Sequence, residues 1–163
     1  MTPVAQSKLV GRDGYGTCWT AALASVLDVP EHAVPHFADP ARFSDGPEGD
    51  GEVPSPIEAA VNVGAPLGWW TATLGWLWML GHELCEVDPT LPPRHPRRPE
   101  DPFLIASGLS PRSPGPDGRE ISHAVVYARQ PDGSYLLAHD PYPDGHGLVG
   151  EPRQFYAVRP DRP

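Results

Sequence analysis

Three residues of this chain, Cys18, His123 and Asp140, are of the types that together carry out nucleophilic catalysis. A cysteine attacks as its thiolate, a histidine takes the thiol proton, and a carboxylate fixes the tautomer and orientation of the histidine. Each residue alone also fits a plainer interpretation, as a buried helix cysteine, a hydrogen-bonded core histidine and a turn-capping aspartate. Catalysis requires that the fold bring all three together.

Cys18 is expected in the first turn of a buried helix. Residues 18–28 are apolar or small on every face, contain no internal glycine or proline, and end before Val29-Pro30. Two glycines and the potential cap Thr17 precede the segment. Because the free amides and the dipole at a helix N-terminus favour negative charge, this position suits a thiolate.

His123 and Asp140 are expected to meet across a β-hairpin. Strands are predicted over residues 122–129 and 134–139, around a Gln-Pro-Asp-Gly sequence that suits a type I turn. A turn closing on Pro131 and Asp132 would place His123 directly opposite Asp140, with Cβ atoms about 5 Å apart. A turn centred one residue later would make His123 face Tyr142 and leave Asp140 as a diagonal neighbour.

The remaining segments predict one α+β domain over residues 1–163, in which an N-terminal helical lobe, with the nucleophile helix, packs on a C-terminal antiparallel sheet. Its four tryptophans between residues 69 and 78 are expected to pack in the core. Helical segments are predicted at residues 31–37, 56–63 and 69–80, strands at 103–107 and 153–158, and loops or connections at 38–53, 90–102 and 108–119.

Composition excludes several partner classes. With 163 residues, 39% hydrophobic content and five tryptophans, the chain can build one core. Its net charge of −9 leaves no basic surface for nucleic acid. The apolar stretch 65–80 is shorter than a membrane span, and the first residues lack a signal-peptide core, so a cytoplasmic protein without a membrane partner is expected. Neither cysteine has zinc-ligand spacing, so no metal or cofactor is expected, and Cys85 is interpreted as structural. Oligomeric state stays open.

The segment Tyr15-Gly16-Thr17-Cys18-Trp19 resembles the nucleophile segment of papain-like cysteine peptidases. Further along, His123-Ala124-Val125-Val126-Tyr127 and His139-Asp140-Pro141-Tyr142-Pro143 resemble the histidine and acid strands of small bacterial and phage members of that superfamily. The resemblance implies a papain-like fold with Cys18 as nucleophile, His123 as base and Asp140 as orienting acid.

The sequence departs from the papain-like pattern where a second oxyanion donor would be expected. These enzymes usually place a glutamine shortly before the cysteine, whereas Arg12 stands at about that spacing and the nearest upstream glutamine is Gln6. The backbone amide of Cys18 would be one donor, and Gln6, Arg12 or Tyr15 the second. The separation between cysteine and histidine is also shorter than in cathepsins.

The expected function is a cysteine hydrolase that cleaves an amide or related acyl bond, as a peptidase, isopeptidase or amidase, in a peptide, protein or small acyl substrate. An acyl transferase with the same triad and a non-catalytic binding module of the same fold are the alternatives. A metal site at His139, Asp140, Asp144 and His146 ranks lower, because aspartate is common in such turns without any ligand. The loop 107–112 lacks a serine-nucleophile pattern and is expected either at the surface or lining the substrate cleft.

Overall fold

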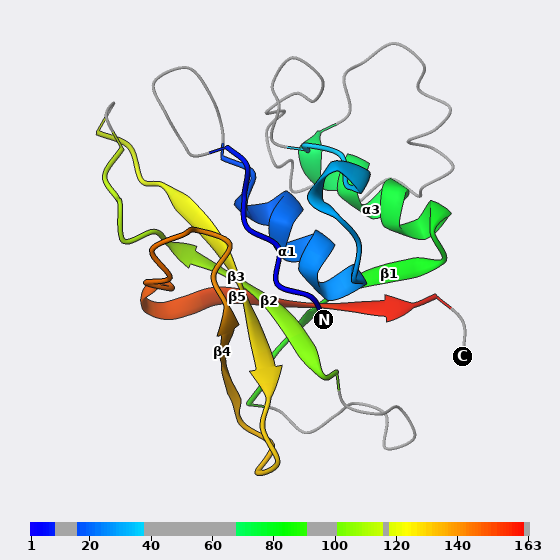
Figure 1. The fold of residues 1–163 in the computed structure, drawn as a ribbon. Helices are drawn as coiled ribbons and strands as arrows, with labels where there is room; N and C mark the ends of the chain where they lie inside the picture. Colours follow the sequence, from blue (N-terminus) through cyan, green and yellow to red (C-terminus); the bar gives the residue numbers. More distant parts are fainter. Residues whose placement is uncertain (9–15, 38–67, 91–100, 116–117, 162–163) are drawn as a thin grey trace.

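The structure is a computed structural model that describes residues 1–8, 16–37, 68–90, 101–115 and 118–161. Within this part, two α-helices and one short 3-10 helix accompany a five-stranded antiparallel sheet, so the predicted α+β class is confirmed (Figure 1). The elements are α1 (Cys18–Leu27), η1 (Glu31–Ala33), α3 (Trp69–Met79), β1 (His82–Val87), β2 (Phe103–Leu109), β3 (Ser122–Arg129), β4 (Tyr135–His139) and β5 (Val149–Pro160).

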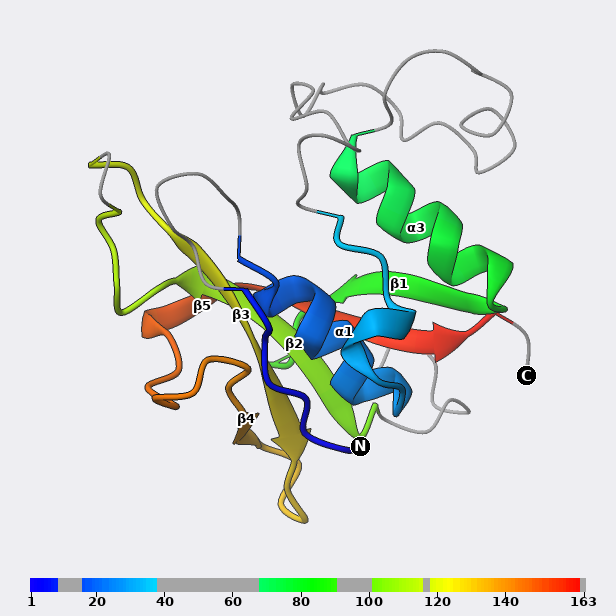
Figure 2. The ribbon, with the colours of Figure 1, turned by 45° about the horizontal axis from the view of Figure 1, so that its top comes forward.

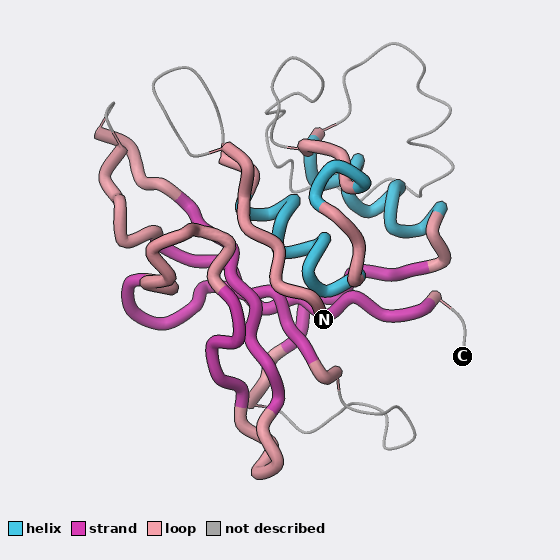
Figure 3. Tube along the Cα trace, in the orientation of Figure 1, coloured by secondary structure: helices cyan, strands magenta, loops and turns pink. Residues whose placement is uncertain are grey.

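The sheet has the strand order β1-β5-β2-β3-β4, and every neighbouring pair is antiparallel. The last strand along the chain, β5, therefore lies inside the sheet between β1 and β2. Both α-helices lie on the same side of the sheet, where α1 contacts β2 and β3 and α3 contacts β1 (Figures 2 and 3). The helix that carries Cys18 is thus placed over the strand that carries His123.

The core lies between α1 and the sheet, where Leu23, Ile105 and Val126 are fully buried. The helix α1 is buried on nearly all sides, which explains why its sequence is apolar or small throughout. Its predicted extent of residues 18–28 is nearly confirmed, because Asp28 follows as a left-handed C-cap with φ of 62°.

The tryptophans of α3 are only partly placed as predicted. Trp69 and Trp70 pack against Trp19, with ring centroids 6.0 Å away in each case. Trp78, however, is 49% exposed, so its assignment to the core is wrong. Leu77 occupies the buried position of that turn, and the next residue, about 100° further around the helix, points away from the sheet. No helix in the described part of the chain is long and apolar enough to cross a membrane.

Several boundaries differ from the predicted ones. The strand β1 is not among the elements predicted from the sequence. The strands β2 and β5 are longer than predicted. The helical turn predicted for residues 31–37 ends at Ala33, because Pro35 cannot donate the hydrogen bond that would continue it. The predicted helix 56–63, the loop 38–53 and most of the connection 90–102 lie outside the described residues.

An N-terminal arm, residues 1–8, fastens α1 to the loop that follows β4. The amide of Val4 donates to Ser25 Oγ on α1 at 3.0 Å, and the amide of Gln6 donates to the carbonyl of Pro141 at 2.9 Å. His139 Nε2 donates to the Val4 carbonyl at 2.8 Å. The arm therefore joins the helix that carries Cys18 to the segment that carries Asp140.

Candidate active site

The hairpin of β3 and β4 does not have the register expected from its turn residues. Gly133 N donates to Gln130 O at 3.0 Å, and Gln130 N donates to Ser134 O at 2.7 Å. Gly133 has a φ of 89°, so a type I turn is followed by a glycine bulge. The predicted turn on Pro131 and Asp132 is therefore present, but the bulge shifts the pairing, so the first paired residues are Arg129 and Tyr135 and the predicted register is wrong.

A second irregularity follows between Val126 and Tyr127, after which Val126 pairs with His139. This pair has the register of the alternative turn, but it is the last pair between β3 and β4. Asp140 lies beyond the end of β4, so the expected direct cross-strand pairing of His123 with Asp140 does not occur.

His123 and Asp140 nevertheless contact each other. His123 Nε2 donates to Asp140 Oδ1 at 2.7 Å, and the two side chains are only 1% and 4% exposed. Asp140 Oδ1 also accepts the amide of Tyr142, and Oδ2 accepts the amide of Gly147, both at 2.8 Å. The carboxylate is thus positioned by a local turn around its own backbone, and not by strand pairing.

Burial is the largest single influence on both titrating groups, and in each case other contacts outweigh it. It acts to raise the pKa of Asp140, but the hydrogen bonds from His123, Tyr142 and Gly147 lower that pKa below 3.8. It acts to lower the pKa of His123, but hydrogen bonding to Asp140 and the interactions with Cys18 raise it from 6.5 to about 9. At neutral pH the pair is therefore an imidazolium bound to a carboxylate.

Cys18 opens α1 with a free, partly buried thiol. It lies close enough to His123 to affect the pKa of the imidazole through hydrogen bonding and charge. Nδ1 of His123 is the ring nitrogen that does not contact Asp140, and it forms no hydrogen bond with any described residue. Such loose geometry is common in unliganded active sites. The structure thus brings all three predicted residues together, with the free nitrogen of His123 left for the thiol.

The N-terminal turn of α1 has no side-chain cap. Thr17 occupies the cap position, but its hydroxyl accepts the amide of Lys8 at 3.1 Å and makes no capping bond to the helix. The carbonyl of Lys8 accepts the amide of Thr17 at 3.0 Å. The arm therefore fixes the residue before Cys18, and the first amides of the helix receive nothing from Thr17.

Of the three expected side-chain oxyanion donors, the structure describes Gln6 alone, since Arg12 and Tyr15 lie outside the described residues. Gln6 is 7% exposed, and its Nε2 donates to the Lys8 carbonyl at 2.8 Å, the same carbonyl that accepts Thr17 N. The N-terminal arm thus places this amide near the start of α1. In the sequence, Gln6 precedes Cys18 by more than the short spacing at which papain-like peptidases place their glutamine.

The lower-ranked metal site does not form. His139 is bonded to the Val4 carbonyl, and Asp140 is engaged by three donors. Across the described residues, no three His, Cys, Asp or Glu side chains gather closely enough to hold a metal ion. Cys85 lies on β1, where burial first, and then the charge of Glu83, raise the pKa of its thiol despite the opposing effect of Arg159. A raised pKa fits the structural role expected for this cysteine.

The hydrogen bond from the amide of Gly147 to Asp140 could not be predicted from the sequence pattern. Gly147 has a φ of 71°, and an added Cβ would lie 3.2 Å from Leu137 Cδ2. Gly147→Ala is expected to lower the free energy of unfolding by about 1–2 kcal/mol, because alanine resists this conformation. It should also weaken the amide bond to Asp140 and lower the pKa of His123, as measured by NMR titration.

Gly145→Ala is the matched control. Gly145 has a similar φ of 65° and open space around a Cβ, and its amide bonds to the carbonyl of Tyr142 instead of to Asp140. It should lose similar stability without changing the His123 titration. Equal His123 titrations in the two variants would show that the Gly147 amide does not support the pair.

Cys18, His123 and Asp140 thus form one cluster at the start of α1, in which the thiol is partly buried and the other two side chains are buried, although the hairpin register that was expected to pair His123 with Asp140 is different. No protein-family model matches the chain, and no curated protein or solved structure matches it either.

Proposed function

We propose that the protein is a papain-like cysteine hydrolase that cleaves an amide or related acyl bond through Cys18. The observation that supports this most is the buried His123–Asp140 pair, joined at 2.7 Å, whose second imidazole nitrogen is unbonded beside a thiol at a helix N-terminus. Nucleophile, base and orienting acid come from α1, β3 and the loop after β4, as a triad requires.

In the proposed reaction, Nδ1 of His123 already holds the proton that Cys18 has lost, and the thiolate of this ion pair attacks the carbonyl carbon of the substrate. The carbonyl oxygen becomes an oxyanion, which the amide of Cys18 and the side chain of Gln6 would stabilise. The imidazolium then protonates the leaving amine as the carbon–nitrogen bond breaks. His123 next takes a proton from water, which attacks the thioester and releases the acid. Asp140 stays ionised throughout.

The raised pKa of His123 suits the acid step of this sequence. With a pKa of about 9, the imidazole carries its proton at neutral pH and is ready to donate it to the leaving group. The lowered pKa of Asp140 keeps the carboxylate charged, so Nε2 remains the donor to it and Nδ1 remains the atom that exchanges protons with the thiol.

An acyl-trapping experiment tests the proposal. The protein is incubated with a panel of N-acyl amino acid 4-nitrophenyl esters, quenched in acid, and examined by intact mass and peptide mapping. We expect one acyl group per chain, on Cys18, which disappears with time as water hydrolyses the thioester. Cys85→Ala should behave like the wild type, because Cys85 lies on β1 at the far edge of the sheet from the β3–β4 hairpin.

Two outcomes decide against hydrolysis by Cys18. Acylation that is absent, or equal at Cys18 and Cys85, would contradict a specific nucleophile and would favour a binding module. Acyl-enzyme that is stable in water but is discharged by added propylamine would instead identify a transferase that uses the same three residues.

A further inference from the structure

The connection between β2 and β3 holds a positively charged side chain beside the candidate site. Arg112 lies in a turn closed by Ser113 N, which donates to Ser110 O at 3.0 Å. The turn is anchored because Ser110 is fully buried and its amide donates to Ile121 O at 2.9 Å. Ile121 comes two residues before His123, so this turn is fixed relative to the imidazole.

Two contacts position the guanidinium of Arg112, a hydrogen bond at its Nε edge and an aromatic ring against its face. Its Nε donates to Ser110 Oγ at 3.3 Å, and its Cζ lies 3.6 Å from the centroid of the Tyr142 ring. Tyr142 in turn donates its amide to Asp140 Oδ1. Arg112 is therefore connected through Tyr142 and Asp140 to His123, and its terminal Nη groups are left for another partner.

Arg112 differs from Arg153 and Arg159 in its charge environment. Arg153 pairs with Glu120 and Arg159 pairs with Asp101, whereas no carboxylate among the described residues pairs with Arg112. This is notable in a chain of net charge −9. A preorganised guanidinium with free Nη groups is matched to a carboxylate, which it can bind with two parallel hydrogen bonds.

The segments that carry Arg112 and Cys18 lie on the same side of the molecule. The described parts of the β2–β3 connection, the loop after β4 and the N-terminal end of α1 all lie on the left-hand side of the molecule (Figures 1 and 2). The contacts of Arg112 with Tyr142, and of Asp140 with His123, join these loops to the strand beneath α1. Arg112 is thus linked to the thiol of Cys18 through Tyr142, Asp140 and His123 in turn.

We propose that Arg112 binds a carboxylate of the substrate, so that the site prefers acyl donors that carry an acidic group a few bonds away from the scissile carbonyl. This inference rests on the proposed function, because it assigns the substrate class of that same site. The carboxylate belongs either to an acidic side chain or to a chain terminus, since the guanidinium presents the same chemistry to both.

Alkylation probes test this without knowledge of the natural substrate. N-iodoacetyl derivatives of glycine, β-alanine and γ-aminobutyrate each place a carboxylate at a different distance from the reacting carbon, and the corresponding amides are neutral isosteres. In every case the thiolate displaces iodide and forms a thioether. The measured quantity is the ratio of the rate constants for the acid and its amide at Cys18, and the spacer that gives the highest ratio reports the distance to Arg112.

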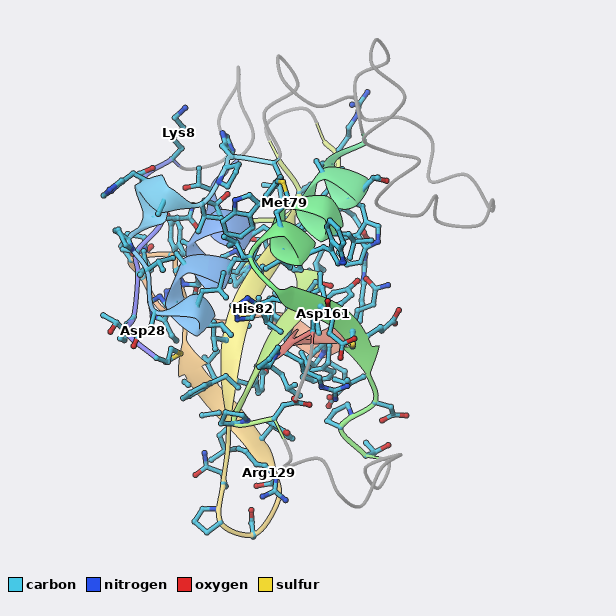
Figure 4. All side chains as sticks on the ribbon, turned by 90° about the vertical axis from the view of Figure 1, so that its right-hand side faces the viewer. Lys8, Asp28, Met79, His82, Arg129 and Asp161 are labelled. Carbon is cyan, nitrogen blue, oxygen red and sulfur yellow. The ribbon has the colours of Figure 1, made fainter. Side chains whose placement is uncertain are left out.

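In Arg112→Gln, the highest ratio is expected to fall about 10-fold, the size of one charge-assisted hydrogen bond. Arg112→Lys should give an intermediate ratio, because lysine keeps the charge but lacks the planar fork. Arg129→Gln is the matched control: it removes the same charge at the hairpin tip (Figure 4), at the opposite end of β3 from His123, and should leave the ratio unchanged. The N-iodoacetyl derivative of aspartic acid α-amide carries its carboxylate on the side chain alone, so it distinguishes binding of a side-chain acid from binding of a terminal acid.

The outcomes separate this inference from the proposed function. If the ratio is unchanged in Arg112→Gln while alkylation still depends on His123, Arg112 does not bind carboxylates and the hydrolase proposal stands. If the rates for acid and amide fall equally, Arg112 acts only by holding Tyr142, which also overturns the inference. Alkylation of Cys18 that is indifferent to His123 would instead contradict the catalytic site itself.

Discussion

Replacement of His123 by alanine is expected to slow the alkylation of Cys18 by iodoacetamide at pH 7 about 100-fold, at the lower end of the effect of a positioned proton-transfer group. The imidazole, with a pKa of about 9, supplies a positive charge beside the thiol, and the variant loses it. Time courses by mass spectrometry between pH 5 and 9 measure the effect. Cys85, whose pKa is raised, serves as the slow internal reference in the same chain.

Two further variants make this result interpretable. His123 is 2% exposed, so its removal leaves Asp140 buried without its partner. His123→Gln is therefore measured alongside, because an amide can still donate to the carboxylate but cannot hold the proton. His82→Ala, on β1 at the other edge of the sheet (Figure 4), removes an imidazole far from the site and should alkylate like the wild type. Unchanged rates in both His123 variants, with native circular dichroism, would remove His123 from the mechanism.

Elements whose signals are local were predictable from the sequence. The helix α1 follows from an apolar run that ends before Val29-Pro30, and the β3–β4 hairpin follows from two β-rich runs around a proline and a glycine. The strand β1 was not predictable, because its pairing is with β5, more than sixty residues further along the chain, and its His-Glu-Leu-Cys-Glu-Val sequence shows only weak alternation. Long-range pairing leaves little trace in a short segment.

The three residues proposed for the site lie close together, but they are not positioned in the way that was predicted. Asp140 reaches His123 through a turn that bonds its carboxylate to the amides of Tyr142 and Gly147, after two register shifts that the turn residues did not reveal. Gln-Pro-Asp-Gly permits more than one hairpin register, and the positive φ of Gly133 selects between them. The N-terminal arm and the position of Gln6 depend on tertiary contacts alone, which no periodicity encodes.

Asp140→Ala is expected to lower the free energy of unfolding by about 3–5 kcal/mol, which is the usual cost of removing one partner of a buried charged pair. The substitution removes the acceptor of three donors: His123 Nε2, the amide of Tyr142 and the amide of Gly147. Asp140→Asn should cost less, because it keeps one acceptor oxygen and the side-chain volume. Urea denaturation at pH 7, monitored by circular dichroism, gives both values.

The pH dependence of stability distinguishes loss of this pair from a general packing defect. A pKa that folding raises from 6.5 to about 9 stabilises the protein fully below pH 6.5, and this stabilisation is lost as the pH rises through about 9. The free energy of unfolding should therefore fall by about 3 kcal/mol between pH 6 and pH 10. The lowered pKa of Asp140 affects stability at acidic pH. Its contribution to the free energy of unfolding is present above pH 3.8 and is lost as the pH falls further.

In Asp140→Ala, the loss of stability between pH 6 and pH 10 should therefore be much smaller than in the wild type, because the main contact that raises the pKa of His123 is gone. Tyr127 and Tyr135, whose pKa values are raised mainly by burial, titrate alike in both proteins and cancel in the comparison. A variant that is destabilised equally at pH 6 and pH 10 would show that Asp140 serves packing alone, and His123 would then lack the charged partner that the proposed mechanism requires.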